Sequence, residues 1–98
     1  MEGKNEVHIV GFVTDYPTPM AKTGGGRPNC FCPCGVQVKK HKVYFDMRLL
    51  DDYAREAYQM LRPGTQFEVR GCIGEYCGGL QVIARTVKIL KQPKGGPG

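Results

Sequence analysis

Hydrophobic and polar residues alternate along much of this chain with the period of two that is typical of β-strands. Alternating stretches, and stretches rich in Val and Ile, predict five strands over residues 6–17, 35–40, 43–50, 65–73 and 80–90. The Gly- and Pro-rich residues 18–29 are expected to form a loop. The polar pair at residues 41–42 is expected to connect the second strand tightly to the third.

The third predicted strand, residues 43–50, divides into two faces. Val43, Phe45, Met47 and Leu49 fall on one side, and Tyr44, Asp46, Arg48 and Leu50 fall on the other. Phe67 alternates with polar residues in the same way in the next strand. We therefore expect Phe45 and Phe67 to lie in the core.

Residues 51–61 carry the one clear helical pattern. Apolar side chains recur with helical spacing at Tyr53, Ala54, Ala57, Tyr58 and Leu61. Asp51 or Asp52 can cap the helix N-terminus and complement its dipole, and Pro63 with Gly64 ends it. This spacing predicts that both tyrosines pack into the core.

The order of these elements is strand, strand, strand, helix, strand, strand. Five short strands with a helix between the third and fourth are the arrangement of an OB-fold, a Greek-key barrel. We predict an all-β fold with one short helix, formed by residues 1–90 as a single domain. Residues 91–98 are polar and rich in Pro and Gly, and we expect them to be a disordered tail.

The composition points to an acidic partner. The formal net charge is +5 and the pI is about 9.1, a balance that suits nucleic acid, an anionic surface or an acidic protein. No apolar run approaches the ~20 residues that a membrane span needs, and the N-terminus lacks a signal-peptide pattern. These features predict a cytoplasmic protein whose thiols stay reduced and that has no membrane association.

Three of the five cysteines fall at every second position, at Cys30, Cys32 and Cys34. Zinc sites usually use paired ligands with two residues between them, so this spacing favours small core residues on one face of a strand. If Pro33 breaks the strand, the three thiols and Cys77 form an alternative metal site. The favoured interpretation therefore involves no metal and no cofactor.

Catalytic motifs are not evident. The triple glycine at residues 24–26 lacks the Lys-Ser/Thr pair of a phosphate-binding loop and precedes a predicted strand. The acidic pair Asp51–Asp52 is explained by the helix start. The sequence therefore favours a binding protein over an enzyme.

Four stretches together resemble the bacterial single-stranded DNA-binding protein family, including its tail-less primosomal relative. They are VHIVGFVTDYP, VYFDMRLL, MLRPG and FEVRGCI, and the resemblance spans about residues 6–90. It implies a non-catalytic protein of DNA replication, recombination and repair. Such a protein binds single-stranded DNA by stacking bases on aromatic rings in a basic groove, with little sequence preference. It also implies a homo-oligomer, dimer or tetramer, that can meet other replication proteins.

The resemblance also suggests which residues bind the strand. Tyr44 matches the aromatic that opens the third strand, Leu50 matches a second stacking position, and Tyr76 lies near a third. Phosphate-binding candidates surround them: Lys22, Arg27, Lys39, Lys40, Lys42, Arg48, Arg70, Arg85 and Lys88.

Some features favour a different function. Asp46 occupies a place where the family usually has a basic residue, Leu50 has no aromatic face, and the chain contains no tryptophan. The alternative is therefore a protein-interaction OB module of a primosome or a mobile-element replication assembly, with weak nucleic-acid binding. Dimer against tetramer, and DNA against RNA, stay open at this point.

Overall fold

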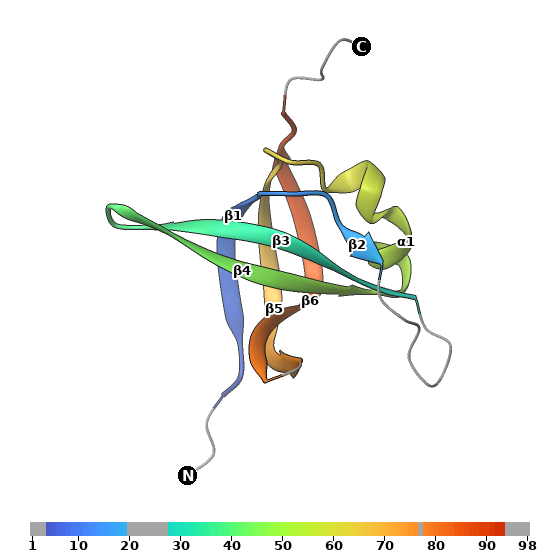
Figure 1. Cartoon of the computed structure of the whole chain (residues 1–98), viewed down its shortest axis with the longest axis horizontal. Coiled ribbons are helices and arrows are strands. Elements are labelled where there is room, and N and C mark those ends of the chain that lie inside the picture. Colours follow the sequence, from blue (N-terminus) through green and yellow to red (C-terminus); the bar gives the residue numbers. More distant parts are fainter. Residues whose placement is uncertain (1–3, 20–27, 77, 94–98) are drawn as a thin grey trace.

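A computed structural model describes residues 4–19, 28–76 and 78–93, and Figure 1 shows the whole chain. The described residues form six strands and one helix: β1 (Val7–Val13), β2 (Thr18–Pro19), β3 (Asn29–Val38), β4 (His41–Leu50), α1 (Asp51–Met60), β5 (Gln66–Tyr76) and β6 (Gly79–Lys91). The predicted order is confirmed for the five long strands and the helix. The short strand β2 lies where the sequence predicted only loop, and it pairs with β3.

The five long strands close into a barrel with the neighbour order β1-β5-β6-β4-β3. β1 completes the closure by pairing with β3 at Phe12 and Val13, opposite Gly35 and Cys34. β4 and β6 run parallel, and the other pairs are antiparallel. Since α1 connects β4 to β5, this is the predicted OB-fold.

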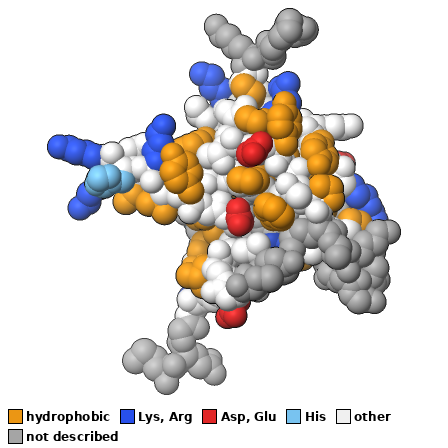
Figure 2. Space-filling view, viewed as in Figure 1, with side chains coloured by type: hydrophobic (Ala, Val, Ile, Leu, Met, Phe, Trp, Pro, Cys, Tyr) orange, Lys and Arg blue, Asp and Glu red, His pale blue; other side chains and the backbone are white. Residues whose placement is uncertain are grey.

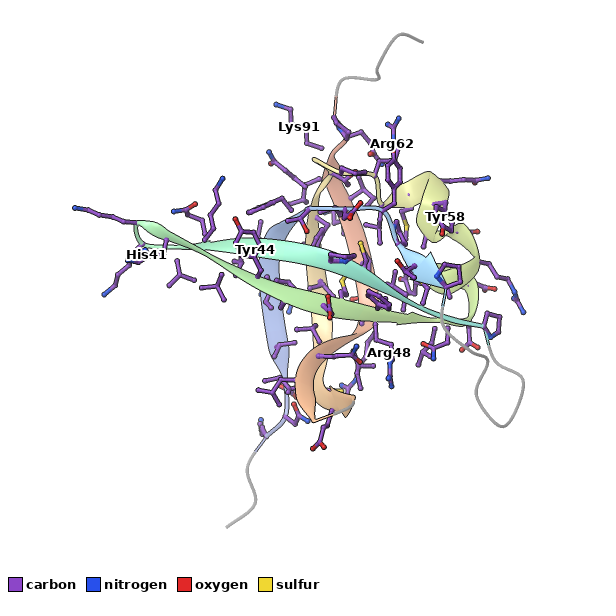
Figure 3. All side chains as sticks on the ribbon, viewed as in Figure 1. His41, Tyr44, Arg48, Tyr58, Arg62 and Lys91 are labelled. Atoms are coloured by element: carbon purple, nitrogen blue, oxygen red, sulfur yellow. The ribbon has the colours of Figure 1, made fainter. Side chains whose placement is uncertain are left out.

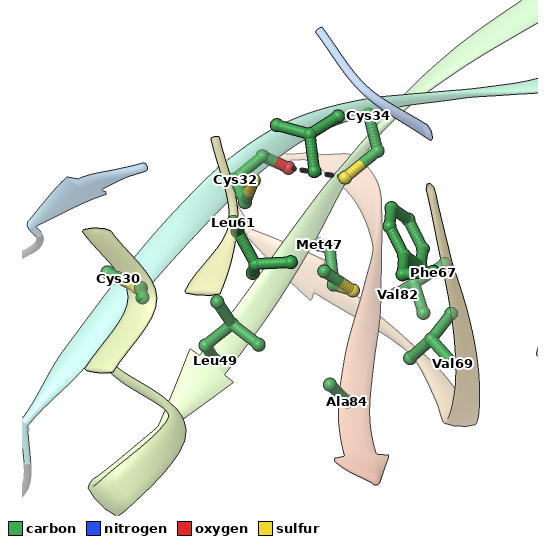
Figure 4. Close-up of a cluster of buried hydrophobic side chains, with 12 residues drawn as sticks. Cys30, Cys32, Cys34, Met47, Leu49, Leu61, Phe67, Val69, Val82 and Ala84 are labelled. Atoms are coloured by element: carbon green, nitrogen blue, oxygen red, sulfur yellow. Dashed lines mark hydrogen bonds between the residues drawn. The ribbon is translucent and has the colours of Figure 1, made fainter. Parts of the chain in front are cut away.

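The core lies inside this barrel and beneath α1, as Figure 4 shows. Its fully buried members come from every long strand and from the helix: Val13, Cys30, Cys32, Cys34, Met47, Leu49, Ala57, Leu61, Phe67, Val69, Val82 and Ala84. Phe67 is fully buried, as predicted, and Phe45 packs against the cluster from its edge.

The cysteines belong to this core. β3 runs without interruption through Pro33, so Cys30, Cys32 and Cys34 stay on one face and are 4%, 0% and 1% exposed. The Cys34 thiol donates a hydrogen bond to the carbonyl oxygen of Cys32 at 3.2 Å. The prediction that they are core residues is confirmed. Cys77 of the alternative metal set lies outside the described residues, and the described part of the chain holds no cluster of potential metal ligands.

We expect this burial to protect the core thiols from alkylation. Burial raises the pKa of Cys30 to about 11, and a hydrogen bond with Cys32 together with burial raises the pKa of Cys34. Because the thiolate is the reactive form, iodoacetamide should modify Cys72, which is only partly buried, long before the three core thiols. Site-resolved mass spectrometry before and after urea unfolding measures this. Equal rates for Cys72 and Cys32 in the folded protein would contradict it.

The β3–β4 hairpin extends beyond the barrel as an arm, visible at the left of Figure 1. Its turn is Lys39–Lys40, because Val38 pairs with His41. The prediction of a turn at residues 41–42 was therefore wrong by two residues. Lys39 has a φ of 54°, the positive φ that the first residue of the favoured two-residue hairpin turns adopts. Val43 is exposed on this arm because no part of the barrel lies beneath it.

Two expectations for α1 were wrong. Its N-cap position is Leu50, with no side-chain capping hydrogen bond, and Asp51 and Asp52 lie in the first helical turn. Tyr58 is 52% exposed, because Ala57 is the helical residue fully buried against the barrel. Tyr53 packs against the core as predicted. No helix in the described residues is long and apolar enough to cross a membrane.

The end of β6 is joined to the helix end by side-chain hydrogen bonds. Gln92 donates through Nε2 to the carbonyl oxygen of Met60 at 2.9 Å. It also accepts a bond from the hydroxyl of the buried Thr65 at 2.8 Å. The fold therefore includes Lys91 and Gln92, and residues 94–98 lie outside the described part.

Candidate nucleic-acid interface

The outer side of β3 and β4 forms a continuous surface, which we call the β3–β4 face. Side chains alternate along a strand, so the residues between the buried cysteines point outward. Three cross-strand pairs form the middle of this face: Phe31 with Arg48, Pro33 with Asp46, and Gly35 with Tyr44. Tyr44 and Arg48 therefore share one side of β4, as the alternation predicted.

Tyr44 is the most accessible aromatic side chain on this face. It is 66% exposed and lies across the strand from Gly35. A Cβ atom on Gly35 would lie 3.2 Å from the Tyr44 ring and 2.6 Å from the Phe12 ring. The absence of a side chain at Gly35 therefore gives both rings room against the strand.

An open hollow of about 480 Å³ lies beside Tyr44. Its lining comes from three parts of the fold: Thr14 after β1, residues 33–34 of β3 with residues 44–46 of β4, and Leu80 at the start of β6. Leu80 is 75% exposed. The β5–β6 hairpin thus borders the β3–β4 face, as it does around the ligand groove of OB-folds.

Phe31 is a further aromatic on this face that the sequence analysis missed. It is half-buried between the core residues Cys30 and Cys32, and it pairs with Arg48 on β4 and Thr18 on β2. The alternation that places the cysteines inside necessarily places Phe31 outside. The signal for this placement was therefore present in the sequence.

The predicted lysines lie along the arm. Lys39 and Lys40 form its exposed turn, next to His41, which Figure 3 marks at the tip. Lys42 lies closer to the barrel, with its Nζ 5.5 Å from the centre of the Phe12 ring, a cation–π distance. Positive charge therefore leads from the tip to Tyr44.

The remaining described candidates separate into two groups. Leu50 is half-buried at the end of β4, on the same side as Arg48. Arg70 and Lys88 instead point outward from β5 and β6, where both neighbour Glu68. Arg85 lies between the groups, since it borders one hollow with Leu50 and another with Arg70.

Glu68 reduces the positive charge available around Arg70. Its carboxylate lies 3.1 Å from His8 Nε2 and 4.0 Å from Arg70 Nε. The hydrogen bond with His8, followed by the charges of Arg70 and Lys88, lowers the pKa of this carboxyl. Arg70 and Lys88 are therefore partly neutralised, and they are not brought to the β3–β4 face with Tyr44.

Four predicted residues have no described side chain in this arrangement. Lys22, Arg27 and Cys77 lie outside the described residues, and the side chain of Tyr76 is not described either. The face itself has an apolar centre with an acidic side chain, Asp46, and Lys and Arg lie mainly at the tip and margins of the view in Figure 2. This distribution suits bases over the centre and phosphates at the rim.

Known proteins match this chain in structure and not in sequence. No protein-family model matches the chain, and no curated protein matches its sequence. Solved structures do match. The wild-type single-stranded DNA-binding protein of Thermus aquaticus has a TM-score of 0.77 at 20% identity, over 100% of this chain and 47% of that one.

Two further structures match over nearly their whole length. The N-terminal domain of PriB from Thermoanaerobacter tencongensis, a dimeric structure, has a TM-score of 0.73 at 22% identity over 90% of this chain and 98% of that one. The Saccharomyces cerevisiae mitochondrial single-stranded DNA-binding protein Rim1 has a TM-score of 0.79 at 14% identity, over 95% and 100%. This chain therefore has the OB-fold seen in single-stranded DNA-binding proteins and PriB.

Proposed function

We propose that this protein binds single-stranded DNA on the β3–β4 face, without catalysis. Bases stack on Tyr44 and Phe31, and phosphates pair with Lys39, Lys40 and Arg48. The observation that carries the proposal is the exposed Tyr44 ring on Gly35, beside a lysine-rich arm. Since every base has a π-face, stacking itself contributes little sequence preference.

We further infer that the protein works as a homo-oligomer in the cytoplasm, in DNA replication, recombination or repair. The dimeric PriB structure with the same fold supports the oligomer. The edge of β1 supports it as well. Val7–Gly11 pair with β5 on one side, and among the described residues only Phe12 and Val13 of this strand pair with β3 on the other. A second copy could pair with the remaining edge.

Fluorescence anisotropy with a labelled oligo-dT at low and moderate salt tests the proposal. We expect micromolar or tighter binding that weakens with salt. Three or four neutralised phosphates would give a slope of log K against log salt of about −2 to −3, at roughly −0.7 per phosphate on a single strand. An oligo-dT that stays unbound at micromolar protein and low salt would contradict the proposal.

The second candidate is a protein-interaction OB module with weak nucleic-acid binding. The observations that favour it are the carboxylate of Asp46 in the middle of the face and the aliphatic Leu50 near its end. Sedimentation analysis beside the titration separates the two functions. An oligomer that does not bind DNA would select this alternative.

A further inference from the structure

Asp46 lines the hollow beside Tyr44. It is exposed on β4, between Pro33 of β3 and Gln81 of β6 in the two strand ladders. Within the described part of the chain, no hydrogen bond or ion pair engages this carboxylate. A free carboxylate in a groove that binds a polyanion repels phosphate. A base of the DNA, and not its phosphate backbone, must therefore lie against it.

Gln81 lies next to Asp46 in the neighbouring strand, but it does not line the hollow. Its side chain is only 6% exposed, and its Oε1 has no hydrogen-bond partner among the residues that the structure describes. A buried polar atom without a partner is rare in native proteins and needs an explanation. Gln81 and Asp46 are register partners across the β4–β6 ladder, so their side chains project from the same side of the sheet. The neighbour of Gln81 in β5 is Gly74, which offers no side chain as a partner.

An unpaired carboxylate at the hollow calls for a ligand that brings N–H donors. Guanine does so, because N1–H and the N2 amino group are adjacent on its Watson–Crick edge and fit a carboxylate with two bonds. Thymine presents a single N–H between two carbonyl oxygens. In adenine and cytosine, one amino group lies beside a ring nitrogen that is itself an acceptor. Guanine is therefore the base whose edge offers two adjacent N–H donors to one carboxylate.

The position of Asp46 suits a base held by Tyr44. Asp46 follows Tyr44 by two residues, a spacing of ~6.6–7 Å along a strand. The carboxylate therefore lies beside a base stacked on Tyr44 rather than beneath it, where a base edge reaches. We propose that Asp46 selects guanine at one position of the bound single strand. This inference rests on the proposed function, since it needs a strand stacked on the β3–β4 face.

Oligo-dT with a single central replacement by dG, dC, dA or deoxyinosine tests the selection in a lithium buffer, where guanines do not form quadruplexes. We expect the dG oligonucleotide to bind tighter than oligo-dT by about five-fold or more, the effect of one good two-bond base contact. Deoxyinosine lacks the N2 amino group and should keep only part of the gain. A 7-deazaguanine oligonucleotide should bind like dG, because its Watson–Crick edge is unchanged.

The Asp46→Asn variant assigns the effect to its residue. It should bind dG and dT oligonucleotides alike, with unchanged or tighter binding of oligo-dT, because the repulsion of phosphate is removed. Glu56→Gln on the exposed side of α1 removes the same charge away from the face and should keep the dG preference.

The outcomes separate the two proposals. Binding that is equally tight for all five sequences overturns guanine selection and leaves single-strand binding in place. A dG preference that persists in Asp46→Asn overturns the role of Asp46. The absence of binding to any oligonucleotide overturns the proposed function itself.

Discussion

Replacing Tyr44 with Ala is expected to weaken the binding of single-stranded DNA by about five- to 150-fold, since one stacked base contributes roughly 1–3 kcal/mol. The ring is 66% exposed and rests on Gly35 next to the Phe12 ring. The Tyr44 ring can therefore stack on a base without a change in the backbone of β4. Truncation removes this stacking surface and leaves the buried core untouched, so the loss should appear in affinity and not in stability.

Tyr58→Ala is the matched control for this measurement. Tyr58 is also an exposed tyrosine, at 52%, but it lies on α1, as Figure 3 shows. Its loss should change anisotropy titrations little, and Tyr44→Phe should keep most of the affinity because the π-face remains. A larger loss for Tyr58→Ala than for Tyr44→Ala would refute the placement of the interface on the β3–β4 face.

Replacing Gly71 with Ala is expected to destabilise the fold by about 3 kcal/mol or more, in the upper part of the range for overpacked sites. A Cβ atom at this position would overlap the carbonyl oxygen of Ile83 in β6. Because this neighbour is backbone, β5 and β6 must separate to admit the methyl group. The register of the pair already shifts between Arg70 and Gly71, which marks a bulge where the strands bend into the barrel.

Gly74→Ala is the control on the same strand. Its added Cβ would also meet Ile83, but at the end of the side chain, which can rotate away. We expect a loss of about 1 kcal/mol or less, the ordinary size of a tolerated core substitution. Urea unfolding followed by circular dichroism compares the two variants with the parent chain. Equal midpoints for Gly71→Ala and Gly74→Ala would contradict the close approach of β5 and β6.

Much of the fold could be predicted because its signals are local. Alternation fixed the two sides of β4, so Tyr44 and Arg48 were placed together correctly. The same alternation put Cys32 and Cys34 inside, and the strand continues through Pro33 because its missing N–H does not interrupt the pairing. The order of strands and helix then selected the OB-fold, since few arrangements place one helix between the third and fourth strands.

The errors arose where exposure depends on distant parts of the chain. Tyr58 has helical spacing that suits burial, yet the barrel wall does not extend under it. Val43 alternates correctly with Tyr44, but the arm carries it beyond the core. Phe31 and Leu80 join the β3–β4 face through strand pairing and hairpin position, and neither residue belongs to a local binding motif.

By itself, the sequence determined which residues of each strand share a side, because that choice depends only on the two-residue repeat of the backbone. The tertiary structure alone decided which sides of different strands meet. Parallel pairing of β4 with β6 brings Gln81 to Asp46, thirty-five positions away in the chain. The pairing of β5 with β1 and β6 gathers Arg70 and His8 around Glu68, and this removes Arg70 from the group beside Tyr44. Such long-range pairings follow from closing one barrel around one core, and no local pattern encodes them.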